Sequence, residues 1–347
     1  MRATSNVRDA EPQTADKVLS VRGLKTVFRT SSGMVHAVND VSLDLAPGEL
    51  LGVVGESGSG KSVTMMSLLK LLPMPPAEIR AGTVEFEGQD LLSLSPRDLR
   101  RVRGARIGFI FQDPMTSLNP VFTVGFQLME PLRKHMGLNK KAAFDRAVEL
   151  LHLVNIPDAE RRMRDFPHQF SGGMRQRVMI AMALTCDPKV LIADEPTTAL
   201  DVTVQAQILE LMRDLRTKLG TAIIWITHDL GVVAGIADRL AVMYGGQIVE
   251  RAPVGELFEN PRHPYTRALL ATLPALEGER SKRLSSIGGQ PPLLREEPSF
   301  CPFVPRCPHA FDRCGQANPP LEAVRNHHEV ACWWDPDTAD APEGANA

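Results

Sequence analysis

Apolar residues in this chain form short continuous runs that are separated by turn signals and helical patterns. Four runs are continuous instead of alternating: Glu49–Gly55, Ala105–Phe111, Val190–Ala193 and Thr221–Thr227. Such runs are typical of strands buried on both faces of a largely parallel sheet. The pattern therefore predicts an α/β fold between Val18 and about Phe258.

Two other regions have different patterns. Before and around the first run, three stretches favour strands of a separate, more antiparallel layer: Val18–Phe28, Met34–Leu45 and Gly82–Glu87. Residues 113–185 are mostly helical in pattern, so we expect an inserted helical subdomain there. Within it, Lys140–Val154 places five apolar residues on one helix face: Ala143, Ala147, Leu150, Leu151 and Val154.

The ends of the chain differ from the middle. Proline and arginine become frequent after Phe258 and periodicity fades, which indicates a C-terminal extension over 259–334. Residues 1–17 have no apolar core of a signal peptide and are expected to form a disordered leader, with a disordered acidic tail over 335–347. The richest apolar stretch, Thr221–Gly246, is interrupted by charged residues, so no membrane span is predicted. We therefore expect a cytoplasmic location.

Composition narrows the possible partners. The 347 residues suffice for one large α/β domain with an appendage, and 43% hydrophobic with 23% charged residues is ordinary for a globular protein. A formal net charge of -2 leaves no basic surface, which disfavours nucleic acid as the main partner.

The strongest chemical signal is a glycine-rich loop that matches G-x-x-x-x-G-K-S between an apolar strand and a helical run. Its glycines let backbone N–H groups converge on phosphate oxygens, and the helix N-terminus adds its dipole. Chance would give this pattern in a chain of this length roughly one time in a hundred. The pattern predicts binding of ATP or GTP, with Lys61 at the β- and γ-phosphates and Ser62 at Mg²⁺. The expected nucleotide contacts are Gly55, Ser57, Gly58, Ser59, Gly60, Lys61, Ser62 and Val63.

Two carboxylates end the strand Val190–Ala193. A strand that ends in Asp-Glu is most often a helix cap or a solvated rim when it is seen alone. Beside a phosphate loop, Asp194 is expected to hold Mg²⁺ through water and Glu195 to polarise the attacking water.

Four further elements separate the nucleotide-hydrolysing families. Gln112 follows one strand and His228 follows another, while Phe170–Gln176 opens a helix with Ser171, Gly172 and Gly173. The segment Thr198–Asp201 follows the two carboxylates. Each element has a structural explanation, such as a helix N-cap for Ser171. Their order along one chain is the informative feature.

Together, these elements resemble the nucleotide-binding subunit of ABC transporters over Val18 to about Phe258. In that family's terms they are Walker A at Gly55–Ser62, the Q-loop at Gln112, the signature at Ser171–Gln176, Walker B at Val190–Glu195, the D-loop at Ala199–Asp201 and the H-loop at His228. The signature departs slightly, with Phe170 for the usual leucine and Met174 for a common glutamine. The resemblance implies a P-loop NTPase with a RecA-like parallel sheet, an antiparallel β subdomain and an inserted helical subdomain.

The resemblance also implies a head-to-tail dimer with two ATP molecules at its interface. Lys61, Ser62, Gln112, Asp194, Glu195 and His228 would act on one ATP, and Ser171, Gly172, Gly173 and Gln176, with Asp201 nearby, on the other. Glu195, His228, Lys61 and Gln112 would be catalytic, and Ser62, Gln112 and Asp194 would surround Mg²⁺. Phe28 stands where the family places an aromatic side chain that stacks on adenine, although a core position explains it equally well.

Two segments resemble the ATPases of oligopeptide and dipeptide importers. They are Gln112–Pro120 and the stretch around Arg262–Leu270. Gly288–Leu293 has the same resemblance. The resemblance implies a second ATPase subunit, two membrane permeases and an external substrate-binding protein as partners. Relatives of this subfamily move nickel, glutathione or oligosaccharides, so these solutes stay open.

Four cysteines in the extension are the last chemical signal. Cys301, Cys307, Cys314 and Cys332 have the spacing C-x5-C-x6-C-x17-C, which fits neither a zinc ribbon nor a ferredoxin run. Four soft thiolates favour iron–sulfur or zinc. Resemblance to peptide-importer ATPases favours a [4Fe-4S] cluster, with zinc, inert thiols or disulfides as alternatives. A histidine could replace one cysteine as a ligand; the candidates are His309, His327 and His328.

Three rival functions remain at this stage. A soluble, non-transport ABC ATPase that acts on nucleic acid or the ribosome usually has two cassettes or a long coiled coil, and neither pattern is seen. An exporter or another importer class would share the ATPase core. A P-loop kinase would need no dimerisation on ATP.

Overall fold

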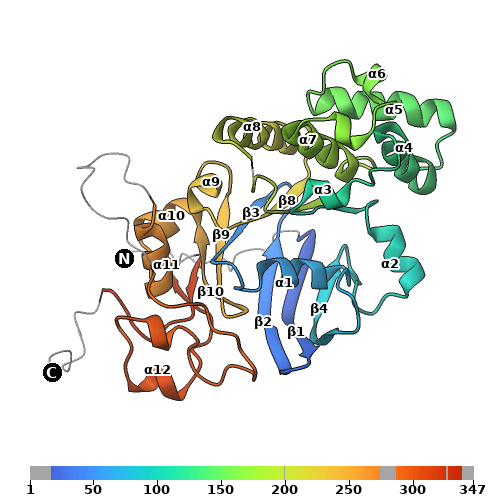
Figure 1. Ribbon diagram of the computed structural model, residues 1–347. Coiled ribbons are helices and arrows are strands. Elements are labelled where there is room, and N and C mark those ends of the chain that lie inside the picture. The colour runs from blue at the N-terminus through green and yellow to red at the C-terminus, as the bar shows by residue number, and fades with distance from the viewer. Residues whose placement is uncertain (1–16, 199, 274–286, 326, 338–347) are drawn as a thin grey trace, which may run out of the picture.

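The computed structural model describes residues 17–198, 200–273, 287–325 and 327–337. Residues 1–16 of the expected leader (1–17), residues 338–347 of the expected tail (335–347) and Ala199 lie outside the described residues. The described chain forms two sheets (Figure 1): an eight-stranded sheet with the order β11-β12-β10-β9-β3-β8-β7-β6 and a four-stranded sheet with the order β2-β1-β4-β5.

The centre of the large sheet is parallel. β3 (Leu50–Val54), β6 (Ile107–Ile110), β7 (Val190–Asp194) and β8 (Ala222–Thr227) are joined in parallel pairs, and β9 (Arg239–Tyr244) pairs in parallel with β3. Every residue of β3, β7 and β8 is buried, and so are the residues of β6 except the half-buried Phe109. The four continuous apolar runs are therefore buried parallel strands, as predicted.

The smaller sheet is antiparallel, also as predicted. It consists of β1 (Leu19–Thr30), β2 (Gly33–Leu45), β4 (Ala77–Phe86) and the short β5 (Gln89–Asp90). β4 begins before the glycine at which the sequence pattern starts it. The reason is that Gly82, at φ 111°, lies where the register with β1 shifts, so this glycine marks a bulge inside the strand.

Helix α1 (Lys61–Leu68) joins the two sheets (Figure 1). Met65 and Leu68 of α1 belong to one buried cluster with Leu43 of β2 and Ile192 of β7. α2 (Pro96–Val102) contributes Leu99 and Val102 to the same cluster. α1 is thereby held between both sheets.

The helical arm lies at one end of the molecule, in green in Figure 1. It contains α3 (Pro114–Ser117), α4 (Val124–His135), α5 (Lys140–Leu153), α6 (Ala159–Arg162), the 3-10 turn η1 (Pro167–Gln169) and α7 (Gly172–Ala183), and α8 (Val202–Leu219) follows β7. In α5, Asn139 caps the N-terminus and the expected apolar face is buried. No helix in the described ranges combines the length and the apolar character that a bilayer crossing requires.

The C-terminal extension continues the large sheet. After α9 (Leu230–Ala234), β9 and β10 (Gln247–Pro253) come α10 (Val254–Glu259), α11 (Pro264–Ala271), η2 (Val304–Arg306), α12 (Asp312–Gln316), β11 (Glu322–Arg325) and β12 (His328–Val330). β12 pairs antiparallel with β10. The fully buried Glu250 carboxylate of β10 accepts the backbone N–H groups of Arg262 and His263 at 2.6 and 2.9 Å and lies 2.8 Å from His328 Nε2.

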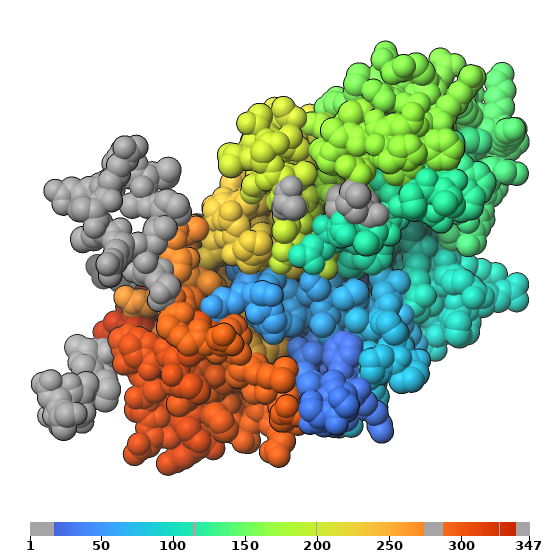
Figure 2. Space-filling model, in the orientation of Figure 1, coloured from blue at the N-terminus to red at the C-terminus, as the bar shows by residue number. Residues whose placement is uncertain are grey.

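The extension also covers the N-terminal strands. Figure 2 shows the orange and red segment packed beside the blue strands. The backbone N–H of His36 in β2 donates to the Leu294 carbonyl at 2.8 Å, and Lys25 of β1 forms an ion pair with Glu297. The extension therefore packs against both sheets.

Candidate nucleotide site

The glycine-rich loop between β3 and α1 is packed tightly against the ends of neighbouring strands. Gly55 has φ 152° and Gly60 has φ 99°. A Cβ at Gly55 would lie 2.3 Å from the Met243 carbonyl oxygen, and one at Gly60 would lie 2.5 Å from the Ala37 carbonyl oxygen. Only glycine fits both positions, because it has no Cβ. The loop can therefore adopt these backbone angles and pack closely against both carbonyl oxygens.

Lys61, the first residue of α1, is only 4% exposed. Its Nζ donates to the Gly55 and Glu56 carbonyls at 2.7 and 2.9 Å, so the side chain lies over the loop that precedes it. Burial lowers the pKa of the Lys61 ammonium, and nearby carboxylates, chiefly Glu195, act in the opposite direction. A buried cation beside the loop is suited to bind an anionic phosphate.

Asp194 ends β7 next to the start of α1. The Ser62 hydroxyl donates to Asp194 Oδ1 at 2.8 Å, although the two residues are 132 positions apart. Burial raises the pKa of the Asp194 carboxyl, the Ser62 hydrogen bond lowers it, and the charge of Glu195 raises it again. A hydroxyl and a carboxylate in contact are hard oxygen ligands of the kind that Mg²⁺ prefers.

Glu195 is the point where three chain segments meet. Its Oε2 lies 3.1 Å from Gln112 Nε2, 3.0 Å from the Thr198 hydroxyl and 3.3 Å from His228 Nδ1. Its backbone has φ 44°, and its N–H donates to the Ile226 carbonyl of β8 at 3.0 Å. The carboxylate is 12% exposed and is therefore oriented by its neighbours.

These groups meet because each follows the carboxyl end of a strand in one parallel sheet. The loop follows β3, Gln112 follows β6, the two acids end β7, and His228 follows β8. Parallel strands present these ends at one edge, where ligands of open α/β sheets bind. The structure thus brings together Lys61, Ser62, Gln112, Asp194, Glu195 and His228.

The signature segment lies elsewhere, in the helical arm. Ser171 caps α7 and accepts the Met174 N–H at 3.3 Å, and Ser171 and Gly172 are exposed. Gly173 packs against α8, because a Cβ there would lie 2.8 Å from Val204. Gln176 is only 1% exposed, so its side chain does not reach the surface of this protomer. Figure 1 shows α7 apart from α1, so one chain does not bring these residues to its own loop.

Two other expected nucleotide contacts remain predictions. Phe28 is half-buried in β1, paired with Val35 and Ala77, and its stacking on adenine is not tested by these contacts. Asp201 is exposed and caps α8 through a 2.9 Å bond from the Val204 N–H. Ala199 of the same expected segment lies outside the described residues.

The four cysteines of the extension line one small enclosed cavity, and all are free thiols. His309, one of the three candidate replacement ligands, also lines it, whereas His328 is bonded to Glu250 instead. Among the described residues, no three histidine, cysteine, aspartate or glutamate side chains are grouped as ligands of one metal ion. The cysteines are therefore gathered without forming a compact single-ion site.

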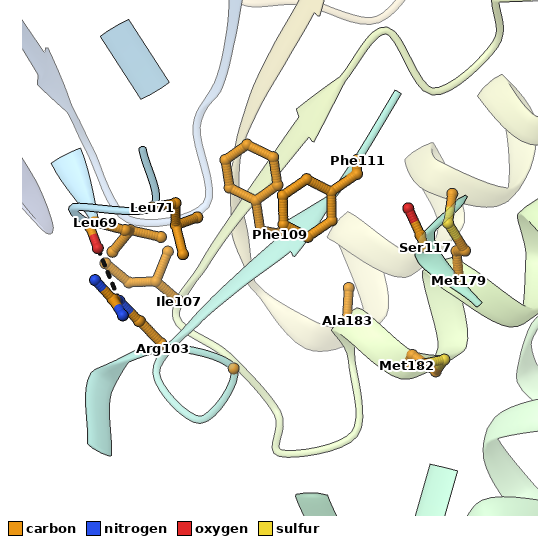
Figure 3. A pocket seen from close by; sticks show the side chains of 11 residues that line it. Leu69, Leu71, Arg103, Ile107, Phe109, Phe111, Ser117, Met179, Met182 and Ala183 are labelled. Atoms are coloured by element: carbon orange, nitrogen blue, oxygen red, sulfur yellow. Dashed lines mark hydrogen bonds between the residues drawn. The ribbon is translucent and has the colours of Figure 1, made fainter. Parts of the chain in front are cut away.

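An apolar pocket of about 320 Å³ lies beside the segment that carries Gln112 (Figure 3). Phe109 in β6 and Phe111, directly after this strand, form one side of the pocket, with ring centroids 4.6 Å apart. Met179 and Met182 of α7 form another side, and Leu71 a third. The pocket thus lies between the edge of the large sheet and the helical arm.

Comparison with known proteins decides the family. Residues 38–198 match the family described as ABC transporter, and residues 249–314 match the oligopeptide/dipeptide transporter C-terminal region. The oligopeptide transport ATP-binding protein OppD of Bacillus subtilis is 53% identical over 95% of this chain and 93% of that protein. This chain belongs to the ABC transporter ATP-binding proteins, in the oligopeptide/dipeptide branch. As a member of that family it is an ATPase that acts as a transporter subunit.

Other relatives agree with this assignment. OppD of Salmonella typhimurium is 52% identical over 93% of this chain and 95% of that protein, and the dipeptide protein DppD of B. subtilis is 50% identical over 92% and 95%. Among solved structures, a dimeric ATP-binding cassette, MJ0796, bound to ADP and phosphate has a TM-score of 0.61 at 26% identity. That alignment covers 68% of this chain and 98% of the cassette, which confirms the predicted ABC ATPase fold.

Sequence reasoning missed one set of contacts in this ABC ATPase. Glu56, inside the glycine-rich loop, is held by Tyr265 and Arg306 of the extension. The motif attaches no role to residue 56, and its partners are 209 and 250 positions away. No spacing pattern reports a contact of that range.

Proposed function

We propose that this chain binds and hydrolyses Mg-ATP to drive an importer of oligopeptides or dipeptides. The observation that carries the proposal is the hydrogen bond from Ser62, at the end of the glycine-rich loop, to Asp194, the first of the two acids. Named relatives at 50–53% identity over most of the chain support peptides as the solute. Uptake of labelled di- and oligopeptides should stop in cells that lack the chain. Uptake of nickel, glutathione or oligosaccharides in their place would contradict the peptide assignment.

Within one active site, the chain's own residues position the reactants. When bound, Mg²⁺ would neutralise charge on the phosphates, held by Ser62 and Asp194 with Gln112 nearby. Lys61 lies over the loop for the β- and γ-phosphates. Glu195 is oriented by Gln112 and His228 so that its carboxylate can accept a proton from the attacking water. Phosphoryl transfer requires mainly such positioning and charge stabilisation.

We propose that the second half of each site comes from a facing ATPase subunit. Ser171 and Gly172 are exposed at the N-terminus of α7, whose first N–H groups can meet a γ-phosphate. The solved relatives described as dimeric support this arrangement. Replacing Ser171 by Arg should leave ATP binding by this chain intact and prevent ATP-dependent assembly with the partner ATPase, measured by light scattering. If Ser171→Arg assembled with the partner ATPase on ATP as the wild type does, the proposal would be contradicted. If the wild type itself formed no dimer on ATP, a P-loop kinase would be favoured instead.

The membrane partners would be two permeases, fed by an external substrate-binding protein, with this chain at the inner face of the membrane. The apolar pocket beside Gln112 supports a permease contact, because it joins the active-site edge to the helical arm (Figure 3). Glutamate in place of Met182 would put a charge in that pocket. Such a variant should retain ATP binding and lose copurification with the permeases, and retained copurification would place their contact elsewhere.

We propose that the four cysteines hold an iron–sulfur cluster. Their common cavity supports a shared centre, and four cysteine thiolates are the ligand set that an iron–sulfur cluster takes. Anaerobic purification should yield a coloured, iron-containing protein. Cys314→Ser should reduce the iron content, whereas Cys186→Ser, outside the cavity, should not. A colourless, iron-free wild type, or one that contains zinc, would contradict the cluster.

A further inference from the structure

The glycine-rich loop carries a carboxylate where it has to bind a triphosphate. Glu56 directly follows Gly55, and its backbone carbonyl accepts the Lys61 ammonium at 2.9 Å. A negative charge at this position repels phosphate groups unless it is neutralised. The extension supplies the neutralising cation.

Arg306 pairs with Glu56 through two hydrogen bonds. Its two terminal nitrogens donate to the two carboxylate oxygens at 2.6 and 2.9 Å, which is the bidentate geometry of the strongest ion pairs. The guanidinium side chain is 4% exposed and also donates to the Gly288 carbonyl at 2.8 Å. It is therefore fixed in place and screened from solvent.

Tyr265 of α11 holds the same loop residue by its backbone. Its hydroxyl accepts the Glu56 N–H at 2.8 Å. The ring is buried against Tyr244 and Phe303, at centroid distances of 4.6 and 5.4 Å, and Arg306 lies over the Tyr244 ring. One aromatic cluster thus carries both groups that contact Glu56.

The cysteine cavity adjoins these contacts. Arg306 ends the η2 turn and directly precedes Cys307, while Phe303 and Val304 follow Cys301 closely. The Val304 N–H donates to the Cys301 carbonyl at 3.2 Å, and Cys301 and Cys307 both line the cavity. The turn that carries Arg306 is therefore bounded by two of the four cysteines.

We propose that Arg306 and Tyr265 are positioning residues of the nucleotide site, through which the cysteine-bearing extension sets the affinity of the loop for ATP. Arg306 neutralises Glu56, and Tyr265 fixes the backbone N–H that precedes the phosphate-binding groups. Preorganised binding groups lose less entropy when the ligand arrives. The inference rests on the proposed function, since it assumes that ATP binds to this loop.

The first test is the affinity for Mg-ATP, measured by calorimetry on the full chain. Arg306→Met should weaken binding at least about tenfold, because a loop carboxylate loses its partner. Adding Glu56→Gln to that variant should restore most of the affinity, since the unpaired charge is then gone. The matched control is Arg262→Met, which breaks another ion pair of the extension, with Asp335 and Asp337, that does not contact the loop.

A milder pair of variants guards against a failure to fold. Tyr265→Phe and Thr266→Val each remove one buried hydroxyl from α11. The Tyr265 hydroxyl bonds to the loop backbone, whereas the Thr266 hydroxyl has no hydrogen-bond partner among the described residues. We expect about fivefold weaker ATP binding for Tyr265→Phe, and unchanged binding for Thr266→Val.

The outcomes separate the two levels of the account. A wild-type chain that does not bind ATP overturns the proposed function itself. Wild-type affinity in Arg306→Met and Tyr265→Phe, or loss that Glu56→Gln does not relieve, overturns the positioning role and leaves the ATPase assignment standing.

Discussion

Replacing Glu195 by Gln tests the chemistry of the site with little change in its shape. Gln112 and the Thr198 hydroxyl both donate to the same oxygen, Oε2. A glutamine can turn its carbonyl oxygen to that position and keep both bonds, while it loses the charge and the basicity. We therefore expect ATP binding and thermal stability to stay near those of the wild type.

The expected loss is in turnover. Removing a positioned general base typically lowers the rate by about a hundredfold to ten-thousandfold, or about 3–5 kcal/mol in activation free energy. Phosphate release under saturating Mg-ATP, with the partner ATPase present, measures it. Thr198→Val is the matched control, because it removes one hydrogen bond to Oε2 and keeps the carboxylate, so a loss of about fivefold is expected. Turnover of Glu195→Gln at the wild-type rate would refute the general-base role.

Two further predictions concern stability. Gly60→Ala should lower the free energy of unfolding by about 2–4 kcal/mol in urea titrations, because φ 99° and the Ala37 carbonyl oxygen 2.5 Å from the new Cβ both oppose a side chain. Gly58→Ala is the control, since Gly58 has φ 80° and no atom within 4 Å of its Cβ position, and it should cost only about 1 kcal/mol. Equal losses in the two variants would contradict the packing argument. Burial lowers the pKa of His263 to about 4, against the ordinary histidine value of 6.5. Between these two pH values the unfolded chain binds more protons than the folded chain. The free energy of unfolding should therefore fall by up to about 3 kcal/mol as the pH decreases from 6.5 to about 4. His263→Asn should flatten this part of the pH profile, and an unchanged slope would assign the effect to another group.

The sequence predicts the core because a strand buried on both faces leaves a continuous apolar run. Leu50–Val54 and Ala222–Thr227 are such strands, and the motif residues that follow their ends meet at one sheet edge. The short strands Glu322–Arg325 and His328–Val330 span too few residues for any periodicity. Their place in the large sheet is set by Glu250 and its buried partners instead.

The contacts of Glu56 show the other limit of sequence reasoning. The motif fixes the glycines, Lys61 and Ser62, because the phosphate chemistry requires them, but it leaves residue 56 free. Arg306 pairs with the side chain at that position and Tyr265 bonds to its backbone N–H, and the fold brings both residues from the extension. Tertiary pairs of this kind have no local signal.

The central claim is that a triphosphate binds over the glycine-rich loop, where Lys61 lies beside the two acids. Calorimetric titration of Mg-ATP into the wild type and Lys61→Ala tests it most directly, with Lys70→Ala as the control for a half-buried lysine that donates to the Leu92 carbonyl outside the loop. The account predicts saturable binding to the wild type and the control and no measurable binding to Lys61→Ala. Equal binding by all three proteins would contradict it.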